Sequence, residues 1–324
     1  MHILIANNCK IPVFAYGGTE RVIWDLGKRL TELGHIVSFL VQKGSHCDFA
    51  TIYEFNKNLP IEAQIPKGID LVHFQFNPLQ DFDFPYVVTE HSNHDLKNVM
   101  SRNTIFLTKN HAERHGSDQF VYNGLDWRTY GPVDLSGPRK RFHFLGKAAR
   151  PDKNIRGAID VALQSGVELD VLGGSRLNMN RHFRFTWSPS IHFHGMVGGT
   201  EKFRLLNQSK GLIFPVTWHE PFGLAITESL YFGCPVFGTP YGSLPELTPE
   251  DCGFLSASCE ELAEAVAHKN YDPRRCHEFA LNYFGAEQMT LGYLDKYKRV
   301  MDGESLHTEM PYLRGPRDHL PWNN

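Results

Sequence analysis

Short apolar runs alternate with amphipathic segments along most of this chain, and no other feature constrains its fold as strongly. Such runs are typical of buried parallel strands, and the amphipathic segments between them are typical of the helices that connect such strands. The pattern therefore predicts an α/β protein, built from repeated β-α units around parallel sheets.

The apolar runs form two series, separated by a stretch that has none. The first predicts strands at residues 2–6, 36–41, 71–74, 86–89, 104–107 and 120–122. The second predicts strands at residues 142–145, 169–172, 191–193, 212–215, 236–237 and 254–255. Between the first two strands, Val22, Leu26, Leu30 and Leu33 recur every three or four residues, which predicts a helix that ends at Gly34.

The stretch between the two series, NGLDWRTYGPVDLSGPRK at 123–140, is rich in Gly, Pro, Asp and Arg and is typical of a linker. A chain of 324 residues also suits two domains. We expect domains at 1–128 and 129–285, with a helix and tail at 286–324 that return to the first domain. Ligands of open parallel sheets bind beyond the carboxyl ends of the strands, so functional residues are expected in the strand-to-helix loops.

Composition excludes several classes of protein. Lys and Arg total 33 against 36 Asp and Glu, a net charge of -3 that gives no sign of a nucleic-acid-binding protein. The six cysteines are scattered, without the spacing of a zinc or redox motif. No apolar run approaches the length of about 18 residues that spans a membrane, and MHILIANNCK resembles a first strand more than a signal peptide. These features predict a cytoplasmic protein without a metal site.

The most informative segment follows the expected strand at 212–215. Glu220 and Glu228 bracket seven residues, and Gly223 stands where a helix begins. Exposed backbone N–H groups at such a start attract a phosphate, and the two carboxylates can accept hydrogen bonds from hydroxyl groups beside it. This arrangement suits a sugar nucleotide. The alternative from spacing alone is that Glu220 caps the helix and Glu228 is a solvated helix residue.

Two further loops carry candidate phosphate-binding features. In FLGKAARPDKN, Lys147 follows a strand and Lys153 stands six residues later, so a tight loop can bring both ammonium groups to one diphosphate. Gly17 and Gly18 precede the first helix and allow a close backbone approach. The segment is not GxGxxG, and this disfavours a nicotinamide enzyme.

Two strings, HEPFGLAITESLYFGCPVFGTPYGSLPE at 219–246 and GGTERVIWDLGKRLTELGH at 17–35, resemble the signatures of the retaining glycosyltransferases of family four, the glycosyl transferases group 1. The resemblance extends more loosely over about residues 1–302. It implies the GT-B fold, two Rossmann-like domains whose parallel sheets face a central cleft. In that family the second domain holds the nucleotide-sugar donor, and the first shapes the acceptor site.

The resemblance also implies roles for individual residues. It places Glu228 on the ribose hydroxyls, Glu220 on the donor sugar, and His91, after the strand YVVT, opposite that sugar. Lys147 and Lys153 correspond to an Arg and a Lys that neutralise the diphosphate, which leaves open whether Lys147 or Arg150 takes the first role; we favour Lys147. The backbone and turn positions implied at the donor site are Gly17, Gly18, Gly173, Gly174, Met196, Val197, Phe222, Gly223 and Leu224.

We therefore expect a retaining glycosyltransferase that moves a sugar from a nucleoside diphosphate sugar, with UDP slightly favoured, to an acceptor hydroxyl. The family precedent is a front-face reaction without a metal or other cofactor. The alternatives are a sugar-nucleotide epimerase or phosphorylase of the same shape, and a catalytically silent nucleotide-sugar-binding module. The acceptor is a sugar, a lipid-linked molecule or a small molecule, and no sequence motif identifies which. Lys97, Arg102, Lys109 and Arg114 leave peripheral membrane contact open without favouring it.

Overall fold

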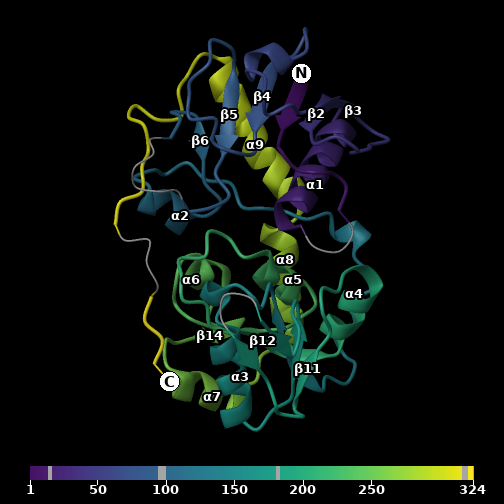
Figure 1. Cartoon of the computed structure of the whole chain (residues 1–324), viewed down its shortest axis with the longest axis vertical. Coiled ribbons are helices and arrows are strands. Elements are labelled where there is room, and N and C mark those ends of the chain that lie inside the picture. Colours follow the sequence, from purple (N-terminus) through teal and green to yellow (C-terminus); the bar gives the residue numbers. More distant parts are fainter. Residues whose placement is uncertain (14–16, 94–99, 180–182, 316–319, 324) are drawn as a thin grey trace. The chain divides into compact units, whose positions relative to one another are not determined.

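The structure is a computed structural model that describes residues 1–13, 17–93, 100–179, 183–315 and 320–323. The chain divides into two compact units. Unit 1 comprises Met1–Trp127 and Tyr283–Pro316, and unit 2 comprises Arg128–Asn282 and Arg317–Asn324. Each unit contains its own parallel sheet (Figure 1).

Unit 1 is built on a six-stranded parallel sheet in the order β3-β2-β1-β4-β5-β6. Its strands are β1 (His2–Ala6), β2 (Ile36–Val41), β3 (Thr51–Glu54), β4 (Leu71–Phe74), β5 (Tyr86–Thr89) and β6 (Thr104–Ile105). Its helices are α1 (Gly18–Glu32), α2 (Lys109–Arg114) and α9 (Ala286–Met301), with a 3-10 turn at Glu62–Gln64. A further 3-10 turn, Trp127–Thr129, spans the junction with unit 2.

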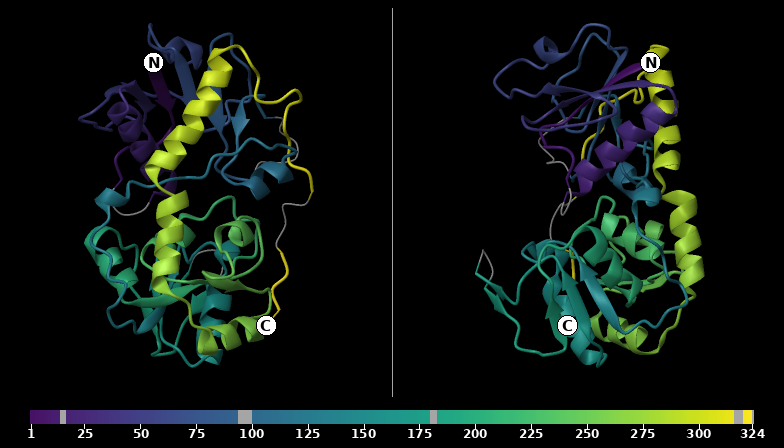
Figure 2. Two further views of the ribbon diagram at one scale, coloured as in Figure 1. Left: turned by 180° about the vertical axis from the view of Figure 1, so that it is seen from behind. Right: turned by 90° about the vertical axis from the view of Figure 1, so that its right-hand side faces the viewer.

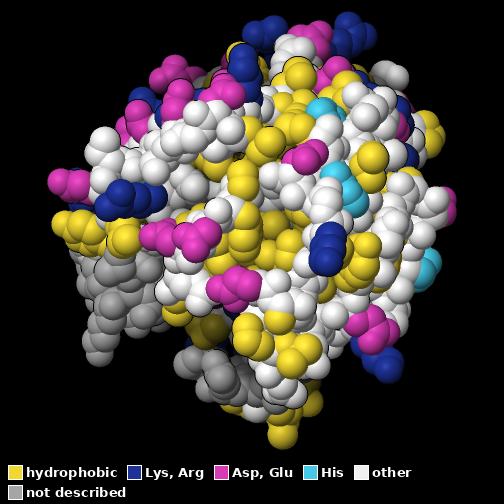
Figure 3. Space-filling view, turned by 90° about the horizontal axis from the view of Figure 1, so that it is seen from above, with side chains coloured by type: hydrophobic (Ala, Val, Ile, Leu, Met, Phe, Trp, Pro, Cys, Tyr) yellow, Lys and Arg dark blue, Asp and Glu magenta, His cyan; other side chains and the backbone are white. Residues whose placement is uncertain are grey.

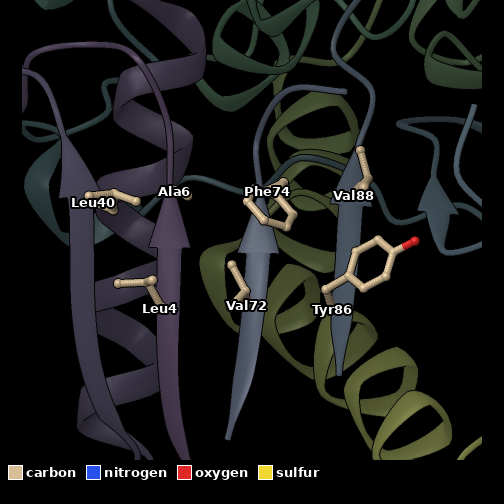
Figure 4. Packing of buried hydrophobic residues seen from close by; sticks show 7 residues of the cluster. All are labelled: Leu4, Ala6, Leu40, Val72, Phe74, Tyr86 and Val88. Carbon is tan, nitrogen blue, oxygen red and sulfur yellow. The ribbon is translucent and has the colours of Figure 1, made fainter. Parts of the chain in front are cut away.

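Alternate residues of four neighbouring strands of this sheet project to one face and form a buried apolar cluster. Figure 4 shows its members, Leu4, Ala6, Leu40, Val72, Phe74, Tyr86 and Val88. Phe82 stacks on Phe74 at 5.1 Å between ring centres and extends the cluster toward the surface. α1 and α9 cover the opposite face (Figure 4). There, a Cβ on Gly27 of α1 would lie 2.4 Å from the Phe39 ring of β2.

Unit 2 repeats the same strand order, β11-β8-β7-β12-β13-β14, and is again parallel throughout. Its strands are β7 (Arg141–Leu145), β8 (Leu169–Leu172), β11 (Ile191–Phe193), β12 (Ser209–Phe214), β13 (Val236–Gly238) and β14 (Gly253–Leu255). Its helices are α3 (Ile155–Gln164), α4 (Gly199–Asn207), α5 (Leu224–Tyr231), α6 (Leu244–Leu247), α7 (Cys259–His268) and α8 (Pro273–Tyr283), the last ending at the junction with unit 1. A 3-10 turn, Pro151–Lys153, precedes α3, and β9 (Leu177–Asn178) pairs antiparallel with β10 (Arg184–Phe185).

This strand order is that of dinucleotide-binding folds, in which the direction of chain progression reverses beside the first strand. In unit 2 the reversal lies between β7 and β12. Ligands of such sheets bind at this point, beyond the carboxyl ends of the strands.

The predicted fold class is confirmed, and the differences concern its edges and small additions. The short edge strand β3 was not predicted because its residues are only half-buried or exposed and form no apolar run. The expected strand at 120–122 is reduced to a single bridge between Phe120 and Phe106. The β9–β10 hairpin was also not predicted.

The end of the chain differs from the predicted domain division, which returned 286–324 to the first domain. α9 belongs to unit 1, but the last described residues belong to unit 2. There, Leu320 N–H donates to the Thr217 carbonyl at 2.8 Å, and Asn323 N–H donates to the Ala257 carbonyl at 2.9 Å (Figure 2). Backbone pairing of this kind is not visible in a polar, proline-containing sequence.

Surface charge is mixed on the face that Figure 3 shows, where acidic and basic side chains are interspersed. Within the described ranges, no helix is long and apolar enough to cross a bilayer.

Candidate functional site

Hydrogen bonds join two loops of unit 2 at the point where its strand order reverses. The Asn154 side chain accepts from Gly157 N–H at 3.0 Å, which caps α3, and donates to the Pro215 carbonyl at 2.9 Å. Thr217 N–H donates to the Asp152 carbonyl at 2.9 Å. These bonds hold the loop after β7, which carries Lys147 and Lys153, against the loop after β12, which carries Glu220.

Lys153 and Glu220 meet at this junction. Lys153 Nζ forms an ion pair with Glu220 Oε2, and the two side chains are only 12% and 7% exposed. Trp218 Nε1–H donates to the same oxygen at 3.0 Å, and Lys153 Nζ lies 5.0 Å from the centre of the Trp218 ring. Since an ammonium group carries three donors, Lys153 can keep Glu220 and still donate to a further anion.

Lys147 and Arg150, the two candidates for the second cation, differ in their contacts. The Arg150 guanidinium donates to both carboxylate oxygens of Asp152 and lies 4.7 Å from the centre of the Trp218 ring. Lys147 is exposed and pairs with no carboxylate in the part of the chain that the structure describes. Arg150 is thus held by a carboxylate of its own loop, and Lys147 is not.

Glu228 is buried rather than solvated, with 2% of its surface exposed. Its Oε1 atom accepts from Lys202 Nζ at 2.5 Å and from the Tyr130 hydroxyl at 2.6 Å. The alternative that Glu228 is a solvated helix residue is therefore wrong. Glu220 does not occupy the N-cap of α5 either, because that position is Gly223.

The start of α5 is a left-handed glycine. Gly223 has φ of 88° and leads into Leu224, while Phe222 is buried. The loop after β13 supports this turn: Ser243 N–H donates to the Glu220 carbonyl at 2.9 Å, and its hydroxyl donates to the Phe222 carbonyl at 2.6 Å.

The remaining donor-side candidates follow β8 and β11 at the same edge of the sheet. Gly173 has φ of 126°, and a Cβ there would lie 2.0 Å from the Gly146 carbonyl oxygen, so only glycine permits the approach of these two loops. Gly174 packs beside Ala148. Met196 is 45% exposed and Val197 is half-buried. The structure thus brings all the donor-side candidates of the second half to one edge of unit 2.

His91 belongs to unit 1, where a chain of buried polar groups holds it. His91 Nε2 lies 2.7 Å from Gln75 Oε1, and Gln75 Nε2 lies 2.9 Å from His73 Nε2. His73 Nε2 also lies 2.7 Å from the Thr89 hydroxyl, and His73 Nδ1 lies 2.7 Å from the Tyr297 hydroxyl. An amide oxygen only accepts hydrogen bonds. The Gln75 oxygen must then accept from His91 Nε2–H, which leaves Nδ1 of His91 as the acceptor nitrogen. Burial lowers the pKa of His91 to about 4, so the ring is neutral at pH 7.

The other unit 1 candidates stand at loop positions. Gly17 precedes α1 with φ of 154°, and a Cβ there would lie 2.7 Å from a Val13 methyl and 2.8 Å from Glu20 Oε2. Gly18 is the first residue of α1. In the basic stretch at 97–115, Lys97 lies outside the described residues, while Arg102 is exposed at the surface. Lys109 pairs with Glu113 at 3.8 Å, and Arg114 donates to Asn93 at 2.8 Å.

Sequence reasoning missed Trp218, Lys202, Tyr130 and Gln75. Trp218 had a usable signal, because it stands two residues before Glu220 in the loop already singled out. Tyr130 lies in the stretch interpreted as a linker, and Lys202 lies on α4, 26 residues before its partner. Only the folded chain brings these two to Glu228.

Comparison with known proteins agrees with this fold. Residues 136–269 match the model of the family described as glycosyl transferases group 1. No curated protein matches the sequence significantly. Many solved structures share the fold: AviGT4, a glycosyltransferase involved in avilamycin A biosynthesis, superposes with a TM-score of 0.75 at 19% identity over 94% of this chain and 98% of its own.

Two other similar structures are sucrose-phosphate synthase from Thermosynechococcus elongatus and HepE from Anabaena in complex with UDP and glucose. The first has a TM-score of 0.71 at 17% identity, over 94% of this chain and 100% of its own. The second has a TM-score of 0.66 at 15% identity, over 91% of this chain and 99% of its own. The resemblance to glycosyl transferases group 1 is thereby confirmed at the level of the family model and of the fold.

Proposed function

We propose that this chain, whose residues 136–269 match the glycosyl transferases group 1 model, is a retaining glycosyltransferase that uses a nucleoside diphosphate sugar. The observation that carries the proposal is the cluster at the reversal point of unit 2. There, Lys153 and Glu220 are paired and largely buried beside the glycine start of α5, and Lys147 stands in the same loop as Lys153.

The chemistry follows from these groups. The bond between the anomeric carbon and the donor phosphate oxygen breaks, and the acceptor oxygen bonds to the same face of that carbon. The acceptor proton passes to the departing phosphate oxygen. Lys147, Lys153 and the N–H groups at the start of α5 stabilise the negative charge that develops on the diphosphate. Glu220 accepts hydrogen bonds from the donor sugar, and Glu228 accepts them from the ribose.

His91 is proposed as an acceptor of a hydrogen bond from the donor sugar. Its neutral ring, with Nε2–H committed to Gln75, offers Nδ1 for this purpose. We further propose that Gly17 and Gly18 approach the donor phosphates or the acceptor, that the backbone at Met196 and Val197 contacts the base, and that the chain requires neither a metal nor another cofactor.

UDP is the proposed nucleotide. HepE was solved with UDP and glucose, whereas the catalytic domain of starch synthase IV from Arabidopsis thaliana was solved with ADP and acarbose, so the fold itself does not select the base. A thermal-shift panel of UDP-, GDP- and ADP-sugars identifies the donor, because a ligand at a hundred times its dissociation constant adds about 2.7 kcal/mol of stability.

Product analysis with the identified donor then tests the reaction. The anomeric configuration of the product, read by NMR, should match that of the donor, and activity should persist in EDTA. Inverted product overturns the retaining mechanism. Conversion of the donor without an acceptor into its epimer indicates an epimerase, dependence on free phosphate indicates a phosphorylase, and donor binding without any turnover indicates a silent binding module.

Substitution of single residues tests the role proposed for each of them. Lys153→Ala should weaken nucleotide binding about tenfold or more and also slow transfer, because its charge faces the diphosphate before and during reaction. Lys147→Ala should act in the same direction, and Lys210→Ala, at an exposed lysine of β12, serves as the control.

His91→Ala should lower the rate of sugar transfer while nucleotide affinity stays nearly intact. Loss of nucleotide binding in folded His91→Ala would contradict this assignment.

A further inference from the structure

The β9–β10 hairpin of unit 2 exposes an apolar face. Residues pointing to one side are largely exposed: Leu177 44%, Met179 75%, Phe183 65%, Phe185 37% and Trp187 85%. Residues pointing to the other side, Arg184 and Thr186, are each 7% exposed. The alternation is that of a two-stranded sheet, in which Leu177 lies directly opposite Phe185. The hairpin projects from the main sheet of unit 2 (Figure 2, right).

Positive charge lies behind this face. The Arg176 guanidinium donates to the carbonyls of Thr186, Ser188 and Ile191, and Arg184 donates to the Ser175 carbonyl and the Thr186 hydroxyl. From α3, Arg156 donates to the Phe183 carbonyl at 2.6 Å. Across the described ranges, none of Arg156, Arg176 and Arg184 forms an ion pair with a carboxylate.

The surrounding sequence adds to this charge. Residues 171–200 contain three arginines and no Asp or Glu, in a chain whose net charge is -3. Arg150, Arg156 and Arg184 also line a pocket of about 180 Å³ at the inner side of the hairpin. Burial and the like charge of Arg156 lower the pKa of Arg184. An apolar, aromatic face backed by Arg156, Arg176 and Arg184 is the composition of an element that lies in the interface of an anionic membrane.

We propose that the β9–β10 hairpin docks this protein on a bilayer that carries anionic phospholipids. The side chains of Met179, Phe183 and Trp187 enter the interfacial region, where tryptophan and phenylalanine partition well, and the arginines behind them lie at the level of the lipid phosphates. A second copy of the chain fits less well, because a two-fold interface would oppose two basic surfaces. Single-stranded nucleic acid fits less well because Leu177 and Met179 offer no ring for base stacking.

The test uses the full chain without donor, so its result does not depend on the proposed function. Sedimentation with vesicles of mixed phosphatidylglycerol and phosphatidylcholine should show binding that weakens as salt is raised, and vesicles of phosphatidylcholine alone should bind much less. Trp187→Ser should lower the partition coefficient about tenfold or more. The matched control is Leu163→Ser, at a leucine of α3 that is 47% exposed and lies outside the hairpin; it should bind like the wild type.

A second variant separates loss of binding from loss of folding. Trp187→Phe should still sediment with anionic vesicles but should lose the blue shift of tryptophan emission that binding produces in the wild type. The proposal is overturned if the wild type does not bind anionic vesicles, or if Trp187→Ser binds them equally well. It is also overturned if Trp187→Ser instead converts a dimer into a monomer or abolishes binding to a single-stranded oligonucleotide.

Discussion

At the scale of single residues, Glu228 combines a proposed role in nucleotide binding with a buried ion pair. Its carboxylate holds the buried ammonium of Lys202, which is only 6% exposed at the side chain. We predict that Glu228→Ala lowers the free energy of unfolding by about 3–5 kcal/mol, because it leaves Lys202 buried without this partner. Urea unfolding measures the loss.

A paired change removes this complication. Lys202→Met with Glu228→Gln deletes both charges of the ion pair, so it should cost less stability than Glu228→Ala alone. If Glu228 contacts the ribose, the double variant still loses about 1.5–3 kcal/mol of nucleotide affinity in calorimetric titration. Unchanged affinity would reduce Glu228 to a structural role.

A second prediction at this scale concerns the ring of His91. Gln75→Glu places a carboxylate beside His91 Nε2–H, and a neighbouring negative charge favours the imidazolium form. The pKa of His91 should rise from about 4 to near or above its ordinary value of 6.5. NMR titration of the histidine ring protons measures this, with Gln75→Met as the control that removes the hydrogen bond without adding charge. A pKa that stays near 4 in folded Gln75→Glu contradicts the assigned contact.

At the scale of elements, the loop after β13 determines where Glu220 stands. Gly242 has φ of 62°, and a Cβ there would lie 2.3 Å from Glu220 N and 2.4 Å from its carbonyl oxygen. Gly242→Ala should therefore displace the Glu220 loop and weaken donor binding about tenfold or more, through backbone contact alone. Gly166→Ala is the control: its φ is also positive, at 68°, but no atom lies within 4 Å of its Cβ. Equal donor affinity in the two variants would show that Gly242 does not support the site.

The sequence predicted most of these elements because buried parallel strands are nearly continuous apolar runs. β1, β2, β4 and β5 begin and end at the predicted residues. The sequence could not predict β9 and β10, where exposed and buried residues alternate over only two-residue strands. It also located Lys153 and Glu220 through motifs, but the pairing of Lys202 with Glu228 depends on how α4 and α5 pack.

At the scale of the whole molecule, neutral histidines that are buried or half-buried predict sensitivity to acid. Burial lowers the pKa of His73, His111 and His143 to about 3 and that of His91 to about 4. Between these values and 6.5 the unfolded chain binds protons that the folded chain does not, so the free energy of unfolding falls as pH falls. At pH 5.5 the four histidines together cost about 5 kcal/mol, relative to neutral pH.

Unfolding curves from pH 7.5 down to pH 5.5 test this prediction. Among the residues that the structure describes, His143 bonds only to the hydroxyls of Ser209 and Ser229, at 2.6 and 2.8 Å. His143→Gln should therefore reduce the pH dependence by about a quarter, even if it lowers stability at neutral pH. A stability that does not change over this range would contradict the neutral state of these rings.

The chain passes from one unit to the other three times, after Trp127, after Asn282 and after Pro316. A fragment that ends at the first passage lacks α9, whose Tyr293 and Tyr297 are fully buried against His73. Neither unit can therefore be produced as a contiguous half of the gene. A chimera that borrows unit 2 from another protein needs three matched splice points, and the last of them must preserve the few terminal residues that bond to Thr217 and Ala257.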